Sequence, residues 1–104
     1  MAKHQTIELN INVENEYLGE EVELISTVKH IMLDYPFRIE HDGSQNVYAI
    51  MPCNTLSQLI DEVEYVMTRE YEHGKCAAPH AFSDFVIEGI VVHENNCANI
   101  IVDS

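Results

Sequence analysis

Histidine and cysteine residues recur at short spacings in the second half of the chain, where they could bind a metal ion. His73 and Cys76 are separated by two residues, with Gly74 allowing a tight turn, and His93 and Cys97 are separated by three. Zinc takes four nitrogen or sulfur ligands, which are commonly supplied as two closely spaced pairs. The sequence therefore offers His73, Cys76, His93 and Cys97 as a zinc site, provided that two loops meet at one end of the fold. Ordinary loop histidines and buried cysteines are the alternative interpretation, since no C-x-x-C pair is present.

Covalent catalysis has less support in the sequence. Cys53 precedes a predicted helix, whose N-terminal dipole could lower the pKa of the thiol. No histidine nearby in the sequence offers a base, so a small buried residue is the better interpretation of Cys53. The chain also lacks a phosphate-binding glycine loop and the G-x-S-x-G and H-E-x-x-H motifs. We therefore predict no enzymatic activity and no required cofactor.

The net charge is the strongest feature of the composition. Eighteen acidic residues against five basic ones give a formal charge of −13. Such a chain repels phosphate backbones, so direct binding to nucleic acid is not expected. The charge is compatible with cations, with basic protein partners, or with a protein that imitates nucleic acid to block an enzyme. The alternative is that the charge only keeps a small protein soluble.

Two stretches carry the acids that we expect to contact a partner. The first runs from Glu14 to Glu23 and contains five acids without a base. The second is the polar face of a helix predicted at Asn54–Glu72, where Tyr65 is either an ordinary exposed tyrosine or an amphipathic anchor for a partner. We therefore predict a small acidic protein that binds a macromolecular partner, one form of which is an inhibitor that mimics nucleic-acid charge. The predicted partner-binding residues are Glu14, Glu16, Glu20, Glu21, Glu23, Asp61, Glu62, Tyr65 and Glu72.

The stretch Asn54–Glu72 has the clearest secondary-structure pattern in the chain. Its apolar residues recur at i, i+3, i+4 and i+7, the spacing of one buried helical stripe. Thr55 and Gln58 have capping-box spacing, and Gly74 can end the helix in a left-handed conformation. Glu70 falls within the stripe, and we expect fraying of the helix end to place it in water. The stripe consists of Leu56, Leu59, Ile60, Val63, Val66 and Met67.

The remaining patterns predict a second helix and five strands. The second helix begins at Gly19, carries acids in its first turn and ends at Tyr35 before a proline. The element order matches the ferredoxin-like split βαβ arrangement, written βαββαβ plus a C-terminal strand. We therefore predict an α+β fold with an antiparallel sheet and two helices on one of its faces. The strands are predicted at Thr6–Val13, Phe37–His41, Val47–Met51, Phe82–His93 and Cys97–Val102.

Apolar residues on both sides of the predicted fourth strand suggest a second surface. An antiparallel sheet covered by helices on one face leaves the other face open, and exposed apolar area of this kind usually marks an interface. We expect a homodimer or a partner there, and a regulatory dimer that binds a small molecule is a further alternative. Burial of this face under a loop or the last strand is the other interpretation. The residues expected at this interface are Tyr48, Ile50, Val86, Ile90 and Val92.

Length and composition indicate one compact domain over residues 1–104. The 46% share of hydrophobic residues is enough for a folded core. No apolar run is long enough to span a membrane, and the first residues lack the apolar core of a secretory signal. Three widely spaced cysteines do not form a disulfide framework. We therefore expect a cytoplasmic protein without membrane contact.

Overall fold

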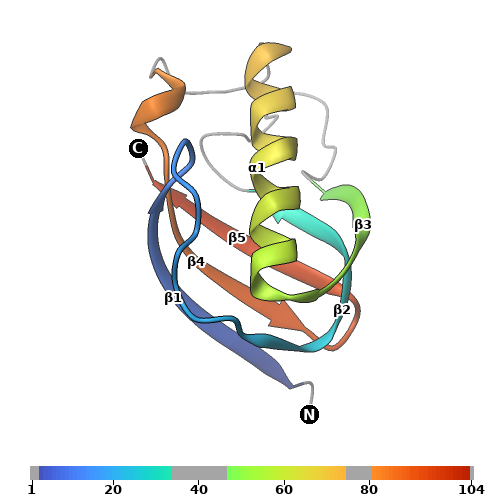
Figure 1. The fold of residues 1–104 in the computed structure, drawn as a ribbon. Helices are drawn as coiled ribbons and strands as arrows, with labels where there is room; N and C mark the ends of the chain where they lie inside the picture. Colours follow the sequence, from blue (N-terminus) through green and yellow to red (C-terminus); the bar gives the residue numbers. More distant parts are fainter. Residues whose placement is uncertain (1–2, 34–46, 75–80, 104) are drawn as a thin grey trace.

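The computed structural model describes residues 3–33, 47–74 and 81–103 of the 104-residue chain. Within these ranges it contains five strands, one α-helix and one short 3-10 helix (Figure 1). This composition confirms the predicted α+β class. The elements are β1 (His4–Asn12), β2 (Glu23–Leu33), β3 (Val47–Thr55), α1 (Leu56–Glu72), η1 (Phe82–Asp84), β4 (Val86–His93) and β5 (Cys97–Asp103).

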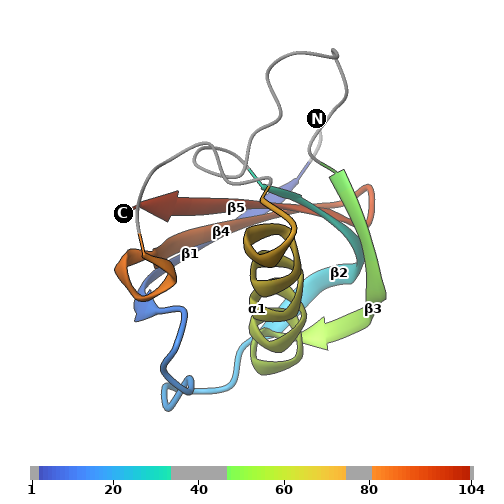
Figure 2. The ribbon, with the colours of Figure 1, turned by 90° about the horizontal axis from the view of Figure 1, so that it is seen from above.

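The five strands form one mixed sheet in the order β1-β4-β5-β2-β3. Neighbouring strands are antiparallel except β2 and β5, which run parallel. One face of the sheet is covered by α1, which connects β3 to β4 (Figure 1). Figure 2 shows the sheet curving around α1, with residues 13–22 on one side of the helix and β3 on the other. The two edge strands, β1 and β3, therefore lie on opposite sides of α1.

The helix predicted at the centre of the chain is confirmed as α1, because its apolar stripe packs on the sheet. All six stripe residues are buried, and Gly74 follows the helix with a φ of 73°. The prediction for Glu70 is wrong, since this residue is 3% exposed. The helix continues to Glu72 without fraying and holds Glu70 against the core, where Arg69 Nε lies 3.6 Å from its Oε1. No helix within the described ranges is long and apolar enough to cross a membrane.

The second predicted helix is wrong, because its sequence forms strand β2. Buried Leu24, Val28 and Ile31 are spaced by four and three residues, which imitates a helical stripe. The spacing arises because the register between β2 and β3 shifts twice along the strand. Such irregularities insert residues and change the direction of side chains in a strand. The ferredoxin-like layout with two helices on an antiparallel sheet is therefore replaced by one α-helix on a mixed sheet within the described ranges.

The core lies between α1 and the sheet, and it contains residues that we expected on an open face. Ile90 and Val92 of β4 have no exposed surface. Tyr48 and Ile50 of β3 are half-buried and pack against the core, and Val86 is also half-buried. The expected placement is wrong because β4 turns Ile90 and Val92 toward α1. Ile90 and Val92 are therefore not exposed for the predicted interface, whereas Tyr48, Ile50 and Val86 remain partly exposed.

The other predicted strands are confirmed in part. Val47–Met51 extends to Thr55 as β3, and Cys97–Val102 corresponds to β5. The long strand predicted at Phe82–His93 begins instead with η1, where the Asp84 N–H donates to the Ala81 carbonyl oxygen. The strand predicted at Phe37–His41 lies outside the described residues.

Candidate interaction site beside β1

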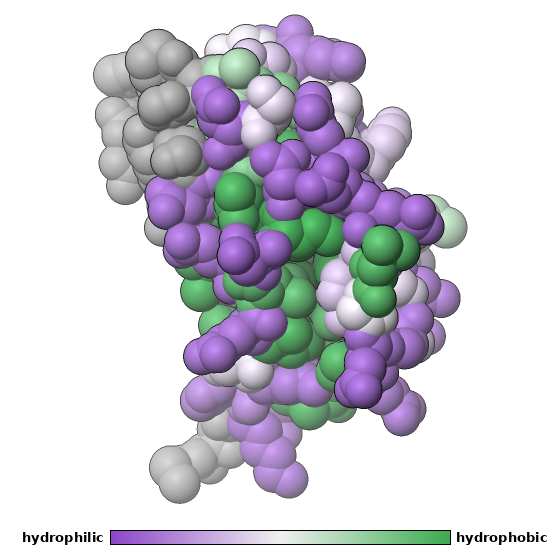
Figure 3. Space-filling model, turned by 60° about the vertical axis from the view of Figure 1, so that its left-hand side comes forward, coloured by the Kyte–Doolittle hydropathy of each residue, from purple (hydrophilic) through white to green (hydrophobic). Residues whose placement is uncertain are grey.

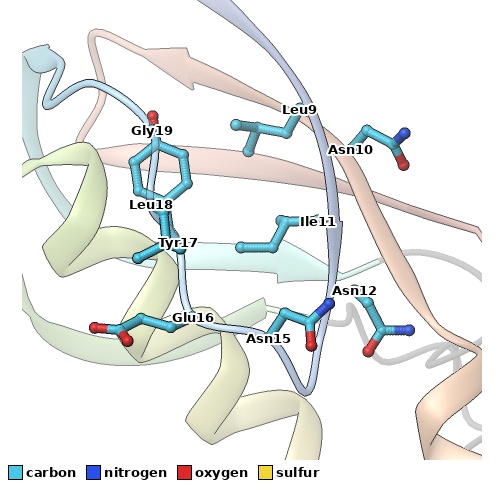
Figure 4. A pocket seen from close by; sticks show the side chains of 9 residues that line it. All are labelled: Leu9, Asn10, Ile11, Asn12, Asn15, Glu16, Tyr17, Leu18 and Gly19. Carbon is cyan, nitrogen blue, oxygen red and sulfur yellow. The ribbon is translucent and has the colours of Figure 1, made fainter.

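A hollow lies between β1 and the segment that follows it (Figure 4). Residues 13–22 turn back after β1 and run beside it on the α1 side of the sheet (Figure 1). The hollow has a volume of about 320 Å³ and is lined by residues 9–12 and 15–19. We call it the β1 groove. Leu9 and Ile11 point into it from β1, whereas Asn10 and Asn12 point away (Figure 4).

Polar side chains fix both ends of the segment that forms the outer wall of the groove. At one end Asn12 Oδ1 accepts from the Glu14 N–H at 2.9 Å, and the Asn12 carbonyl oxygen accepts from the Asn15 N–H at 2.9 Å. At the other end Gln5 Nε2 donates to the Glu23 carbonyl oxygen at 3.2 Å, and Gln5 Oε1 accepts from the N–H of residue 25 at 3.0 Å. The segment is therefore held at its ends by two residues of β1.

Tyr17 and Gly19 shape the wall between these two ends. The Tyr17 hydroxyl donates to the Glu20 carbonyl oxygen at 2.6 Å, which bends the segment back on itself. A Cβ atom at Gly19 would lie 2.5 Å from the Tyr17 hydroxyl oxygen. Gly19 thus leaves room for the tyrosine ring, and it does not begin a helix as predicted.

A β-bulge in β1 lies at the groove. The register between β1 and β4 shifts between Glu8 and Ile11, so that Leu9 lies within the irregular part of the strand. Bulges change the direction of side chains at sheet edges. Gly89 faces Glu8 across the ladder, and a Cβ atom there would lie 3.1 Å from the Ile7 carbonyl oxygen. The close approach of β4 to this part of β1 therefore depends on a glycine.

The groove exposes apolar surface to solvent. Figure 3 shows apolar surface gathered between hydrophilic flanks on the side of the molecule where β1 and residues 13–22 lie. Leu9 and Tyr17 are half-buried, whereas Leu18 is 86% exposed. The lining of the groove is mixed, since Asn15 and Glu16 join Leu9, Ile11 and Tyr17. An aliphatic side chain as exposed as Leu18 beside such a hollow makes this surface a candidate for a contact.

The first stretch of predicted partner-binding acids lies around this groove. Glu16 lines it, Glu14 and Glu20 flank its outer wall, and all three side chains are exposed. Glu23 is also exposed, but it begins β2 and pairs with Thr55. Of these acids, Glu16 alone lines the groove, and Glu14 and Glu20 are exposed in the segment on either side of it.

Glu21 has a structural role that the sequence did not indicate. Its Oε1 accepts from the Ser57 N–H at 2.9 Å, and its Oε2 accepts from the Ser57 hydroxyl. These bonds, with the Ser57 hydroxyl contributing most, hold the pKa of Glu21 below its usual value. The carboxylate thus caps the N-terminus of α1, where the helix dipole favours an anion. The predicted cap at Thr55 is wrong, since its side chain makes no capping hydrogen bond.

Of the second stretch of predicted residues, Glu62 and Tyr65 lie on the β3 side of α1, and Glu72 is its last residue. A hollow of about 260 Å³ between β3 and α1 is lined by Ala49, Ile50, Met51, Glu62, Tyr65, Val66 and Arg69. We call it the β3 cleft. Tyr65 is 63% exposed, as predicted, and the Arg69 guanidinium lies 5.8 Å from the centre of its ring. Glu62 Oε1 accepts from the Met51 N–H at 2.8 Å, so this acid holds β3 against the helix. Asp61 and Glu72 are exposed.

Glu64 was not among the predicted site residues, although it has an unusual environment. Burial, and secondly the negative charge of Asp61, raise the pKa of Glu64 to about 7. Its Oε1 is buried and has no hydrogen-bond partner among the described residues. Glu64 lies two helical turns after Ser57, so it is on the same side of α1 as the Glu21 cap. Its position in the polar part of the helix gave no signal of this burial.

The predicted zinc ligands are spread over the molecule. His73 follows the C-terminus of α1, whereas His93 and Cys97 flank the turn between β4 and β5, toward the opposite end in Figure 1. Cys76 lies outside the described residues. Within the described ranges, no group of three or more histidine, cysteine, aspartate or glutamate side chains could hold a metal ion. His93 and Cys97 therefore flank one turn as predicted, but His73 lies at the other end of the fold.

Cys53 is a buried residue of β3 and not a nucleophile at a helix end. Its thiol donates to the Met51 carbonyl oxygen at 3.1 Å. Burial, followed by the charges of Glu62 and Asp61, raises the pKa of Cys53 to about 11. A thiol with this pKa remains protonated at neutral pH and is a poor nucleophile.

Comparison with models of known protein families, with curated proteins and with solved structures finds no match to this chain. The candidate site therefore rests on its geometry. The residues named from the sequence include Glu16, which lines the groove, but not Leu9, Ile11, Tyr17 or Leu18. The available signal was Leu18 itself, an aliphatic residue beside a glycine within an otherwise acidic stretch.

Proposed function

We propose that this protein binds a basic protein partner through the β1 groove. The observation that carries the proposal is the exposed Leu18 beside a hollow lined by both apolar and polar side chains, in a segment that also exposes Glu14, Glu16 and Glu20. Acids attract and orient a basic partner, whereas Leu9, Ile11 and Leu18 offer apolar surface on which one of its side chains can pack out of water. A surface that served only solubility would need the acids but not the hollow.

The proposed partners include proteins whose natural ligand is nucleic acid. Such proteins expose basic surfaces that bind phosphate groups. A chain with a formal charge of −13 can occupy a surface of this kind and exclude the nucleic acid. The groove adds a contact that phosphate groups do not make, so it would give this interaction a specificity beyond charge.

A selection of random short peptides against the protein tests the proposal even though the partner is unidentified. We expect the enriched peptides to carry net positive charge and at least one large apolar residue, and to bind more weakly as salt is raised. Two groove variants, Glu16→Lys and Leu18→Arg, should each weaken binding by about tenfold.

Matched controls carry the same changes at other exposed positions. Glu94→Lys lies at the turn between β4 and β5, and Met51→Arg replaces an exposed residue of β3. Both control proteins should bind the enriched peptides within about twofold of the unmodified protein. Equal losses in groove and control variants, or enrichment of peptides without positive charge, would contradict the proposal.

A further inference from the structure

The outward edge of β1 carries no strand within the described ranges. Between the Asn12 turn and the Gln5 bridge, no backbone hydrogen bond among the described residues joins β1 to residues 16–22. The outward N–H and C=O groups of β1 are therefore left beside the opening of the β1 groove. An edge of this kind is a template on which another extended chain can form a ladder.

The two faces of the sheet next to this edge differ in chemistry. A strand added to β1 would place alternate side chains on opposite faces. On the α1 side these side chains would enter the β1 groove, over Leu9 and Ile11. On the other side they would approach the exposed Glu8 of β1.

Further acids lie beyond Glu8 on the neighbouring strands. Glu8 pairs with Gly89, which directly follows Glu88 in β4. The nearby carboxylate of Asp103 is the main cause of a raised pKa at Glu88, so two like charges are held close together there. A basic side chain near this pair would reduce their repulsion.

We propose, building on the function proposed above, that the partner binds as an added strand on β1. The bound segment is extended, with apolar residues facing the groove and lysine or arginine facing the acids on the outer side. Charge complementarity selects this occupant over a second copy of the chain, because two copies of a protein with a formal charge of −13 repel each other. Backbone hydrogen bonds to β1 would supply affinity, and the alternating side chains would supply specificity.

An octapeptide of alternating lysine and valine, blocked at both termini, is a suitable probe. Its charge keeps it monomeric in solution, and its alternation matches the two faces of the edge. Backbone N–H groups of a strand alternate between its two edges. Two derivatives, N-methylated either at every lysine or at every valine, therefore each lose the donors of one edge and retain all side chains.

Strand addition predicts that one derivative binds about tenfold more weakly than the parent peptide, or worse, while the other binds nearly as well. Binding of the parent peptide should also slow the hydrogen exchange of alternate backbone amides between His4 and Asn12. Equal affinity of both derivatives, equal loss in both, or no binding of the parent peptide would overturn the strand proposal.

The outcome for the strand is separable from the outcome for the groove. A parent peptide that binds the unmodified protein, loses affinity to Leu18→Arg and tolerates both methylation patterns would show binding in the groove without a ladder. In that case the proposed function would stand and the added strand would not. A parent peptide that binds Leu18→Arg and the unmodified protein equally well would contradict both the proposed function and the added strand.

Discussion

The two edge strands of the sheet, β1 and β3, lie on opposite sides of the same helix, but their backbone N–H groups are protected to different degrees. At β3, Pro52 has no N–H, the Met51 N–H donates to Glu62, and the Asn54 N–H donates to Gln58 Oε1 at 2.9 Å. Side chains of α1 thus occupy two donors of this strand, and proline removes a third. At β1, the described residues provide no comparable cover between Gln5 and Asn12.

The difference indicates that protection of an edge is a local property of the sequence. Proteins commonly protect exposed edges with proline, charged side chains, bulges or covering segments. β3 contains a proline and is covered by side chains of α1, the helix that follows it. β1 has a bulge and the charge of Glu8. Net charge keeps copies of this chain apart, so an open acidic edge stays accessible to a basic partner.

The largest expected effect concerns the attachment of β1 to the rest of the sheet. Ile90 pairs with Ile7 of β1 and Ile100 of β5 and has no exposed surface. Ile90→Ala should reduce the free energy of unfolding by about 3 kcal/mol, because it leaves a cavity beneath both strands. The control Ile101→Ala removes a residue of β5 that is 45% exposed, and it should cost less than about 0.5 kcal/mol. Urea unfolding measures both values.

Equal costs for these two variants would place Ile90 on the solvent side of the sheet. The open-face position predicted for Ile90 from the sequence would then be correct. The contrast between the two edges would also disappear, because β1 would no longer lie on a shared core.

The sequence predicted the elements with regular spacing and failed where the spacing was irregular. The α1 stripe repeats through almost the whole helix, so its buried apolar residues were identified correctly, although the burial of Glu70 was not. In β2, shifts of register place Leu24, Val28 and Ile31 at helical intervals, and a periodicity argument could not distinguish this strand from a helix. The parallel pairing of β2 with β5 depends on that strand and was missed with it.

The candidate site was predictable only in its charges. Glu14, Glu16 and Glu20 are exposed as expected, since acids in a sequence without nearby bases usually face water. In the sequence nothing distinguishes Glu21 and Glu62 from these exposed acids. In the structure each of the two accepts a hydrogen bond from a backbone N–H far away in the sequence. Such pairings depend on the three-dimensional path of the chain, which local patterns do not encode.

A second prediction concerns the side of α1 that carries the Glu21 cap. The pKa of Glu64 is raised from its usual 4.5 to about 7, so the ionised carboxylate destabilises the folded state above that pH. This penalty should disappear as the pH falls from about 7 to about 4.5, where the unfolded chain also becomes protonated. After allowance for solvent screening, Glu64→Gln should be more stable than the unmodified protein by about 1 kcal/mol at about pH 8, and nearly equal at about pH 5. Urea unfolding at both pH values measures the difference.

Asp61→Asn is the control for this titration. It removes the second cause of the raised pKa but leaves Glu64 buried, so it should reduce the pH dependence without abolishing it. A constant difference between Glu64→Gln and the unmodified protein across this range would show that Glu64 has an ordinary pKa. The side of α1 that carries the Glu21 cap would then hold no carboxyl group with a raised pKa.

The smallest expected effect tests whether the protection of β3 depends on one carboxylate. Glu62→Ala removes the acceptor of the Met51 N–H and should cost about 0.5 kcal/mol, because water can replace this half-exposed bond. Hydrogen exchange at the Met51 amide should accelerate, whereas Glu62→Gln, which keeps a carbonyl acceptor, should leave it slow. The lysine–valine octapeptide should still bind one site per chain in Glu62→Ala, since Pro52 continues to interrupt the donors of β3. Binding at a second site would mean that Glu62 alone separates the closed edge from the open one.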